Sequence, residues 1–91
     1  MKKLKVLLVC TENVCRSPMA QGILMRLLES EGMGRLCRVD SAGTHVHQTG
    51  RRPDERAQEV SARHGIDLSG IRARKVRKGD ISSYDYIVAM D

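Results

Sequence analysis

The sequence predicts an α/β fold: a single domain over residues 1–91 with three layers, α/β/α, around a central parallel sheet. Apolar runs of strand length alternate along the chain with amphipathic runs of helical period, in the order β-α-β-α-β. No internal repeat or low-complexity linker interrupts that order. Right-handed crossovers would then place the second and third strands on either side of the first.

The first strand is expected at Leu4–Val9, a continuous apolar run of the kind that a central parallel strand requires. This run is too short for a signal peptide and has no cleavage site of the A-x-A type. A helix should follow, with Ser17 as its N-cap and Pro18 at its first position. Gly32 and Gly34 should end it. Its apolar face is formed by residues at helical spacing: Ala20, Ile23, Leu24, Leu27 and Leu28.

The second strand is expected within residues 35–43, "RLCRVDSAG", where apolar and polar residues loosely alternate. After a loop, residues 53–55, "PDE", open a second helix with the acidic side chains that suit its positive end. Gly65 should close that helix, and its packing side is expected to hold Ala57, Val60 and His64. A basic, irregular segment then leads to a third strand at residues 84–90, "YDYIVAM".

The chain is basic, with 16 Lys and Arg against 11 Asp and Glu and a net charge of +5. Its densest run is Arg72–Lys78, "RARKVRK", which has five cations in seven residues. No aromatic residue lies within the run to stack on a base, so we interpret it as a solvated basic edge and expect no nucleic-acid partner. The charge favours anionic ligands in general.

The three cysteines are an odd number without C-x-x-C or Cys/His ligand spacing. This pattern disfavours both a disulfide framework and a metal site, so we expect no metal and no cofactor. No segment is long enough to span a bilayer, and no membrane partner is expected. A reducing cytoplasm is the expected location. Cys37 is interpreted as a small core residue.

The turn between the first strand and the first helix carries the candidate chemistry. Ligands of parallel α/β sheets bind at the carboxyl ends of the strands, where Cys10 lies. The residues between Cys10 and Arg16 can point their N–H groups into one concavity, and the helix N-terminus adds partial positive charge. Arg16 can hold phosphate oxygens with a bidentate fork. Such an anion site lowers the pKa of a thiol, which makes Cys10 a candidate nucleophile, with Ser17 donating to its thiolate when that thiolate later leaves.

Residues 9–22, "VCTENVCRSPMAQG", resemble the active-site loop of the low-molecular-weight protein tyrosine phosphatases, which follows a C-x-x-N-x-C-R-S-P pattern. The likeness continues in the family's order over essentially the whole chain, through "DSAGT", "RPDERA", "HGIDLSG" and "DYIVAMD". The resemblance implies hydrolysis of phosphotyrosine in proteins through a phosphocysteine intermediate. It also implies that inorganic phosphate or sulfate binds in the loop.

The resemblance further implies a role for each matching residue. Cys10 would be the nucleophile, Arg16 the phosphate clamp and Ser17 a catalytic hydroxyl. Asn13, in a left-handed backbone conformation, and Ser41 would hydrogen-bond each other and support the loop. Cys15 would form a reversible disulfide with Cys10 under oxidation. The substrate would contact Thr11, Glu12, Asn13, Val14, Cys15 and His47.

The sequence departs from the family pattern in ways that bear on rate and specificity. Family members supply a general acid from an Asp-Pro-aromatic segment, whereas the two prolines here are Pro18 and Pro53 and no Asp-Pro pair occurs. Asp91 is assigned a structural role rather than that of the acid. We therefore expect a chain truncated at its C-terminal side relative to the family, with impaired turnover and self-association through the exposed edge of its last strand. Glu12 replaces a glycine and is expected to point to solvent, and His47 stands where tyrosine-directed members have an aromatic wall.

Two alternatives stay open at the level of sequence. Thr11 resembles the branch of the family that dephosphorylates phosphoarginine, in which threonine follows the nucleophile. The chain could also be a phosphate-binding pseudo-phosphatase that retains the loop and has little activity. Turnover separates this second reading from an enzyme, because both readings predict that phosphate binds.

Overall fold

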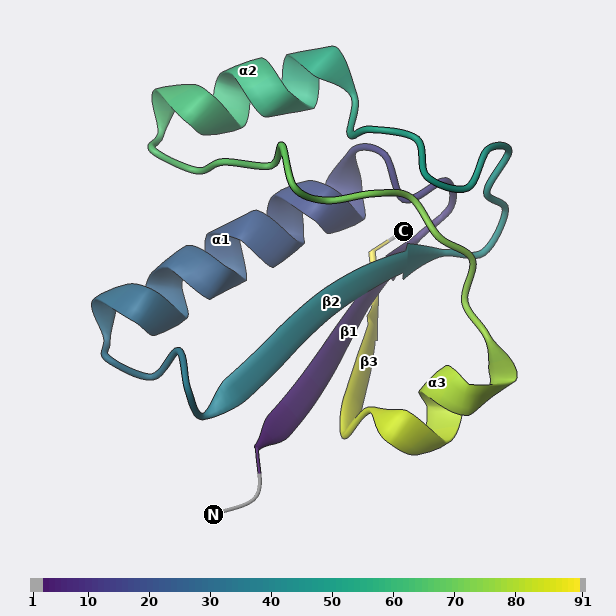
Figure 1. Cartoon of the computed structure of the whole chain (residues 1–91), viewed down its shortest axis with the longest axis horizontal. Coiled ribbons are helices and arrows are strands. Elements are labelled where there is room, and N and C mark those ends of the chain that lie inside the picture. Colours follow the sequence, from purple (N-terminus) through teal and green to yellow (C-terminus); the bar gives the residue numbers. More distant parts are fainter. Residues whose placement is uncertain (1–2, 91) are drawn as a thin grey trace.

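Residues 3–90 are described by the computed structural model and form six elements in the following order. These are β1 (Leu4–Cys10), α1 (Arg16–Ser30), β2 (Cys37–Gly43), α2 (Glu55–Arg63), α3 (Lys78–Ser83) and β3 (Tyr86–Ala89). The strands are parallel and ordered β2-β1-β3, so β1 is central (Figure 1). The predicted α/β class and the placement of the second and third strands beside the first are confirmed.

The core lies on both faces of β1, because successive side chains of a strand point to opposite sides. Val6 and Leu8 form one cluster with Val39 of β2, and α1 packs against this cluster. Leu7 and Val9 form the other cluster with Ala42, covered by Val76 and Tyr84, which flank α3 in sequence. Figure 1 shows α1 on one side of the sheet and α3 on the other, with α2 packed against α1.

The first helix begins two positions earlier than predicted, and this changes the role of Ser17. Cys15 is the N-cap of α1 and caps with no side-chain hydrogen bond. Ser17 is therefore inside the first turn and fully buried, and the prediction that it caps the helix is wrong. The apolar face is also narrower than predicted: Ala20, Leu24 and Leu28 pack on the sheet, whereas Ile23 and Leu27 are exposed. Residues four apart form the single stripe that contacts the sheet.

The second helix follows the predicted start signal but turns a different face inward. The carboxylate of Asp54 accepts a hydrogen bond from the backbone N–H of Ala57 at 3.1 Å and caps α2 as expected. Ala57 and Ser61 are buried, whereas Val60 and His64 are exposed, so their expected packing roles are wrong. The small side chains of Ala57 and Ser61 let α2 approach the rest of the molecule closely.

The last part of the chain contains a helix that the sequence did not predict. In place of an irregular segment, α3 spans six residues, too few to show an apolar period. Asp80 stabilises its first turn by accepting from the backbone N–H of Arg77 at 2.7 Å. The third strand is shorter than expected and begins at Tyr86, because Tyr84 is the C-cap of α3.

Candidate active site

The loop that joins β1 to α1 surrounds a cavity of about 260 Å³ at the carboxyl end of the central strand. Its lining residues are Cys10, Thr11, Glu12, Val14, Cys15 and Arg16. This is the edge of the sheet at which the α/β fold predicts a site. The N-terminus of α1 opens onto the same loop, so its unpaired N–H groups add positive potential there.

Cys10 is held at the base of this loop with hydrogen-bond partners for a thiolate. Its Sγ lies 3.0 Å from Ser17 Oγ and accepts from the backbone N–H of Asn13 at 3.2 Å. Burial alone would raise the pKa of the thiol, but hydrogen bonds from Ser17 and from the Asn13 N–H, together with the charge of Arg16, lower it below its ordinary value. The geometry therefore favours an anionic and nucleophilic sulfur.

Asn13 organises the loop from the inside. It is buried and has φ 59°, the left-handed region that Asn tolerates better than most residues. Its Nδ2 donates to Ser17 Oγ at 2.8 Å and to Ser41 Oγ at 3.0 Å, so the contact expected between Asn13 and Ser41 is present. Its Oδ1 accepts the backbone N–H of Arg74 at 3.0 Å.

These bonds determine the direction of the hydroxyl protons. Ser17 Oγ already accepts from Asn13, so its own proton is free to point at Cys10 Sγ. Ser41 likewise accepts from Asn13 and donates to Gln21 Oε1 at 2.5 Å. The network thus connects the Cys10 thiol to Gln21 of α1 and to Ser41 of β2, so a helix and a strand both hold the loop.

The segment after β2 packs directly against the loop. Thr44 N–H donates to Cys10 O at 3.0 Å, and His45 N–H donates to Thr11 O at 2.7 Å. A Cβ built on Gly43 would lie 2.7 Å from Thr11 O and 3.0 Å from Asn13 N. Backbone atoms of the loop therefore occupy the space that any side chain at position 43 would need.

Gly43→Ala is expected to reduce the stability of the protein by about 1–3 kcal/mol, because the added methyl group pushes on backbone that cannot swing away. It should also weaken the stabilisation of the protein by inorganic phosphate, since the same backbone shapes the loop. Urea unfolding with and without phosphate measures both effects. Gly70→Ala is the control, because no atom lies near the Cβ built at that position. Equal stability of the two variants would contradict the steric argument.

The mouth of the loop carries a contact between Glu12 and His47 and a cation available for ligands. Glu12, which is expected to point to solvent, has a partly exposed side chain whose Oε1 lies 2.9 Å from Nε2 of His47. His47, expected as a substrate wall, is the exposed partner of Glu12 in this contact. Arg16 is exposed and has no ion-pair partner among residues 3–90. Cys15 is exposed, whereas the Cys10 thiol is buried.

Arg74 is held inside the fold, a placement that the sequence did not indicate. The interpretation of the run at residues 72–78 as a solvated edge is wrong for Arg74. Its guanidinium lies 3.2 Å from Asp40 Oδ2 and 3.0 Å from Asp80 Oδ2, with its side chain mostly buried. The one sequence signal was its position between Ala73 and Val76, which both turn inward.

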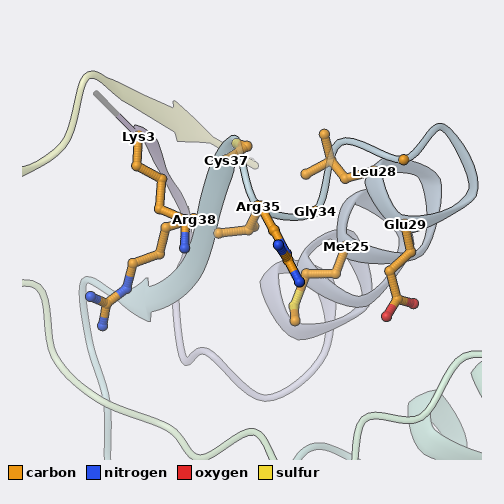
Figure 2. A pocket seen from close by; sticks show the side chains of 10 residues that line it. Lys3, Met25, Leu28, Glu29, Gly34, Arg35, Cys37 and Arg38 are labelled. Carbon is orange, nitrogen blue, oxygen red and sulfur yellow. The ribbon is translucent and has the colours of Figure 1, made fainter. Parts of the chain in front are cut away.

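A larger cavity of about 610 Å³ lies at the opposite end of the sheet, near the end of α1 and the start of β2 (Figure 2). Met25, Leu28 and Cys37 contribute its apolar part, and the half-buried Cys37 packs on the core as predicted. This cavity is remote from the Cys10 network. Among residues 3–90, no cluster of His, Cys, Asp or Glu could hold a metal ion, and no helix is long and apolar enough to cross a membrane.

A family model described as low molecular weight phosphotyrosine protein phosphatase matches residues 5–91. The chain belongs to this family. The human low molecular weight phosphotyrosine protein phosphatase is 42% identical over 94% of the chain and 54% of its own length. The low molecular weight protein-tyrosine-phosphatase YfkJ of Bacillus subtilis is 42% identical over 97% of the chain and 56% of its own length. The chain therefore spans about half the length of the curated relatives it matches.

Solved structures agree with the family assignment. The crystal structure of YfkJ from Bacillus subtilis superposes with a TM-score of 0.97 and 41% identity, over the whole chain and 57% of YfkJ. A Drosophila arginine phosphatase, DARP, superposes with a TM-score of 0.91 and 38% identity, over 97% of the chain and 55% of its own length. Asp91, to which a structural role was assigned, lies outside the described residues.

Proposed function

We propose that the chain hydrolyses phosphotyrosine in proteins, with residues 1–91 acting as one phosphatase-like domain. The observation that carries the proposal is the Cys10 thiol, whose pKa is lowered by hydrogen bonds from Ser17 and from the Asn13 N–H at the base of the loop. The loop ends in Arg16, which has no ion-pair partner among residues 3–90. Family membership supports the same substrate class, since relatives are named as phosphotyrosine phosphatases. Inorganic phosphate and sulfate are the expected small ligands of the loop.

The mechanism has two displacement steps. In the first, Cys10 Sγ attacks phosphorus in line, and a sulfur–phosphorus bond forms as the bond to the phenolic oxygen breaks. The electron pair of that bond leaves on the phenolate, while Arg16 and the loop N–H groups hold the equatorial oxygens. In the second, water attacks phosphorus and releases inorganic phosphate, and the departing thiolate is stabilised by the proton of Ser17.

Phosphoarginine is the second candidate substrate. Thr11, directly after the nucleophile, lines the loop cavity, and a Drosophila arginine phosphatase is among the structures that superpose. Peptides of one sequence that carry either phosphotyrosine or phosphoarginine separate the two candidates. A higher kcat/KM for the phosphotyrosine peptide supports the proposal, and the reverse order favours the alternative.

We further propose that residues 1–91 alone turn over slowly. The sequence has no Asp-Pro pair, and Glu12, a carboxylate at the cavity, is engaged with His47. Loss of general-acid catalysis typically costs about 10²–10⁴-fold in rate. The rate of phenyl phosphate hydrolysis should be reduced far more than that of p-nitrophenyl phosphate, because the p-nitrophenolate leaving group needs no proton.

The decisive experiment combines turnover with ligand binding. The chain is incubated with p-nitrophenyl phosphate and with the phosphotyrosine peptide, and its thermal unfolding is followed with and without phosphate. Release of product together with stabilisation by phosphate supports the enzyme. Stabilisation without any product would identify a phosphate-binding pseudo-phosphatase instead. Failure of both would overturn the assignment of the loop.

Cys15 is proposed as the redox partner of Cys10, in a reducing cytoplasm where the thiols are normally free. After brief hydrogen peroxide treatment, the native chain should regain most of its activity with dithiothreitol, because a Cys10–Cys15 disulfide blocks further oxidation. Cys15→Ser should regain a several-fold smaller fraction of its activity, because Cys10 without a disulfide partner is oxidised irreversibly to sulfinic acid. Cys37→Ser is the matched control and should recover like the native chain. Equal recovery of all three would contradict the role of Cys15.

Self-association is proposed for residues 1–91 when they are studied alone. Among residues 3–90, β3 pairs on one side only, with β1, and its Tyr86, Ile87 and Val88 are exposed. An exposed apolar edge strand can pair with another chain. Light scattering after size-exclusion chromatography should give a mass that rises with concentration. A constant monomer mass would contradict this.

A further inference from the structure

We propose that Arg74 is a positioning residue for the Cys10 loop. Its guanidinium, held between β2 and α3, fixes the backbone N–H that binds Asn13, and Asn13 in turn directs its own N–H at the Cys10 sulfur. The inference rests on the proposed function of the loop and goes beyond the nucleophile, phosphate clamp and loop supports assigned above.

The side chain of Arg74 is anchored at both carboxylates by several bonds. Nε and Nη2 donate to Asp40 Oδ2 at 3.3 and 3.2 Å, while Nη1 and Nη2 donate to Asp80 at 3.0 and 3.3 Å. Tyr84 adds a hydroxyl that donates to the same Asp40 oxygen at 3.2 Å. Burial would lower the pKa of Arg74, but Asp80 and Asp40 raise it, and the Arg74 guanidinium is the main reason that the pKa of Asp80 is lowered.

The backbone of Arg74 is fixed by this anchoring and reaches the active-site loop. Its N–H donates to Asn13 Oδ1 at 3.0 Å, and its C=O accepts the N–H of Gly43 at 2.8 Å. Val76 N–H returns to Gly43 O at 2.9 Å, so this segment runs beside the end of β2. A Cβ built on Gly43 would lie within 3.0 Å of Thr11 O and Asn13 N, so Gly43 leaves room for the backbone of the loop.

Asn13 needs this support because its conformation is unfavourable by itself. Asn enters the left-handed region more readily than most residues, but this conformation still costs free energy that the surroundings must offset. Its amide nitrogen is held by Ser17 and Ser41, while the N–H of Arg74 binds the amide oxygen. Without that bond the buried amide oxygen of Asn13 lacks a partner, which costs free energy. A conformation in which Asn13 turns outward and its oxygen meets water then becomes more favourable. The Asn13 N–H then leaves the sulfur.

The test compares Arg74→Met, which keeps length but removes the charge, with the conservative Arg74→Lys. Arg72→Met is the matched control, since Arg72 is exposed and its guanidinium donates to the nearby carbonyl oxygens of Ser69 and Ile71. Iodoacetamide alkylation of Cys10 is followed from pH 4.5 to pH 9, and fragment-ion mass spectrometry separates Cys10 from Cys15. Alkylation reports the thiolate and needs no turnover.

In Arg74→Met the midpoint of Cys10 alkylation should rise by about one pH unit, which makes alkylation about tenfold slower at pH values below both midpoints. Arg74→Lys should lie between this variant and the native chain, and Arg72→Met should match the native chain. The kcat for p-nitrophenyl phosphate should fall with little change in KM. Other groups near the sulfur, namely Glu12, Arg16 and Ser17, are the same in all variants.

An unchanged midpoint in folded Arg74→Met overturns the inference, as does a rise of equal size in Arg72→Met. If Arg74→Met does not fold, Arg74→Lys is the deciding variant. The role of Arg74 is only structural if Arg74→Lys has the native alkylation midpoint and native circular dichroism but lower thermal stability. The two proposals fail separately. A native chain with a low midpoint but no hydrolysis contradicts the proposed function alone, and an active native chain with a midpoint insensitive to Arg74 contradicts this inference alone.

Discussion

Cys10→Ser is expected to lower kcat for p-nitrophenyl phosphate by at least about 10³-fold, because a serine hydroxyl in this loop stays protonated near neutral pH and is a poor nucleophile. The hydrogen bonds that lower the pKa of the thiol cannot lower that of an alcohol enough to compensate. Product release is followed by absorbance at neutral pH under saturating substrate. The loss should appear in kcat rather than KM, since the substrate still meets Arg16 and the loop N–H groups.

Cys37→Ser is the matched control for this substitution. Cys37 lies at the start of β2, at the opposite end of the sheet, and its replacement should leave kcat within a few-fold of the native value. Phosphate should still raise the unfolding temperature of Cys10→Ser, which shows that the loop is intact. Retention of more than a tenth of the native activity in Cys10→Ser would exclude Cys10 as the nucleophile.

Arg16→Met is the second large effect, with kcat/KM expected to fall by about 10²–10³-fold. The guanidinium is exposed and without an ion-pair partner among residues 3–90, so its removal leaves no unpaired buried charge. The loss should therefore come from the bound phosphoryl group, whose oxygens match the planar guanidinium. Kinetics with p-nitrophenyl phosphate and phosphate-dependent thermal unfolding measure both consequences.

Arg16→Lys tests whether charge or shape matters at this position. Lysine keeps the charge but cannot form the bidentate contact, so it should restore only part of the rate. Arg35→Met is the control, because Arg35 is exposed beside the distant cavity of Figure 2, and it should leave kcat/KM unchanged. Phosphate affinity in Arg16→Met equal to that of the native chain would contradict the role of the residue as a clamp.

Local patterns in the sequence predicted most of the scaffold. The apolar run of β1 and the helical period of α1 are properties of neighbouring residues, and they placed Cys10 at a strand end and Arg16 at a helix start. The carboxylate of Asp54 caps α2 within its own turn, so it too was visible from the sequence. Helix faces were less predictable, because Ile23 and Val60 have the right spacing but are exposed in the structure of residues 3–90.

The sequence by itself determined the order of the strands and the presence of a thiol and a guanidinium on one anion-binding loop, because strand order and helix starts follow from short-range pattern and chain connectivity. Only the tertiary structure decided how that loop is held. Asn13 forms hydrogen bonds with Ser41, 28 residues away in sequence, and with the backbone of Arg74, 61 residues away. Ser17 contacts the Cys10 thiol instead of capping α1. Such partners are chosen by which polar groups become buried together, and burial is a property of the folded chain as a whole.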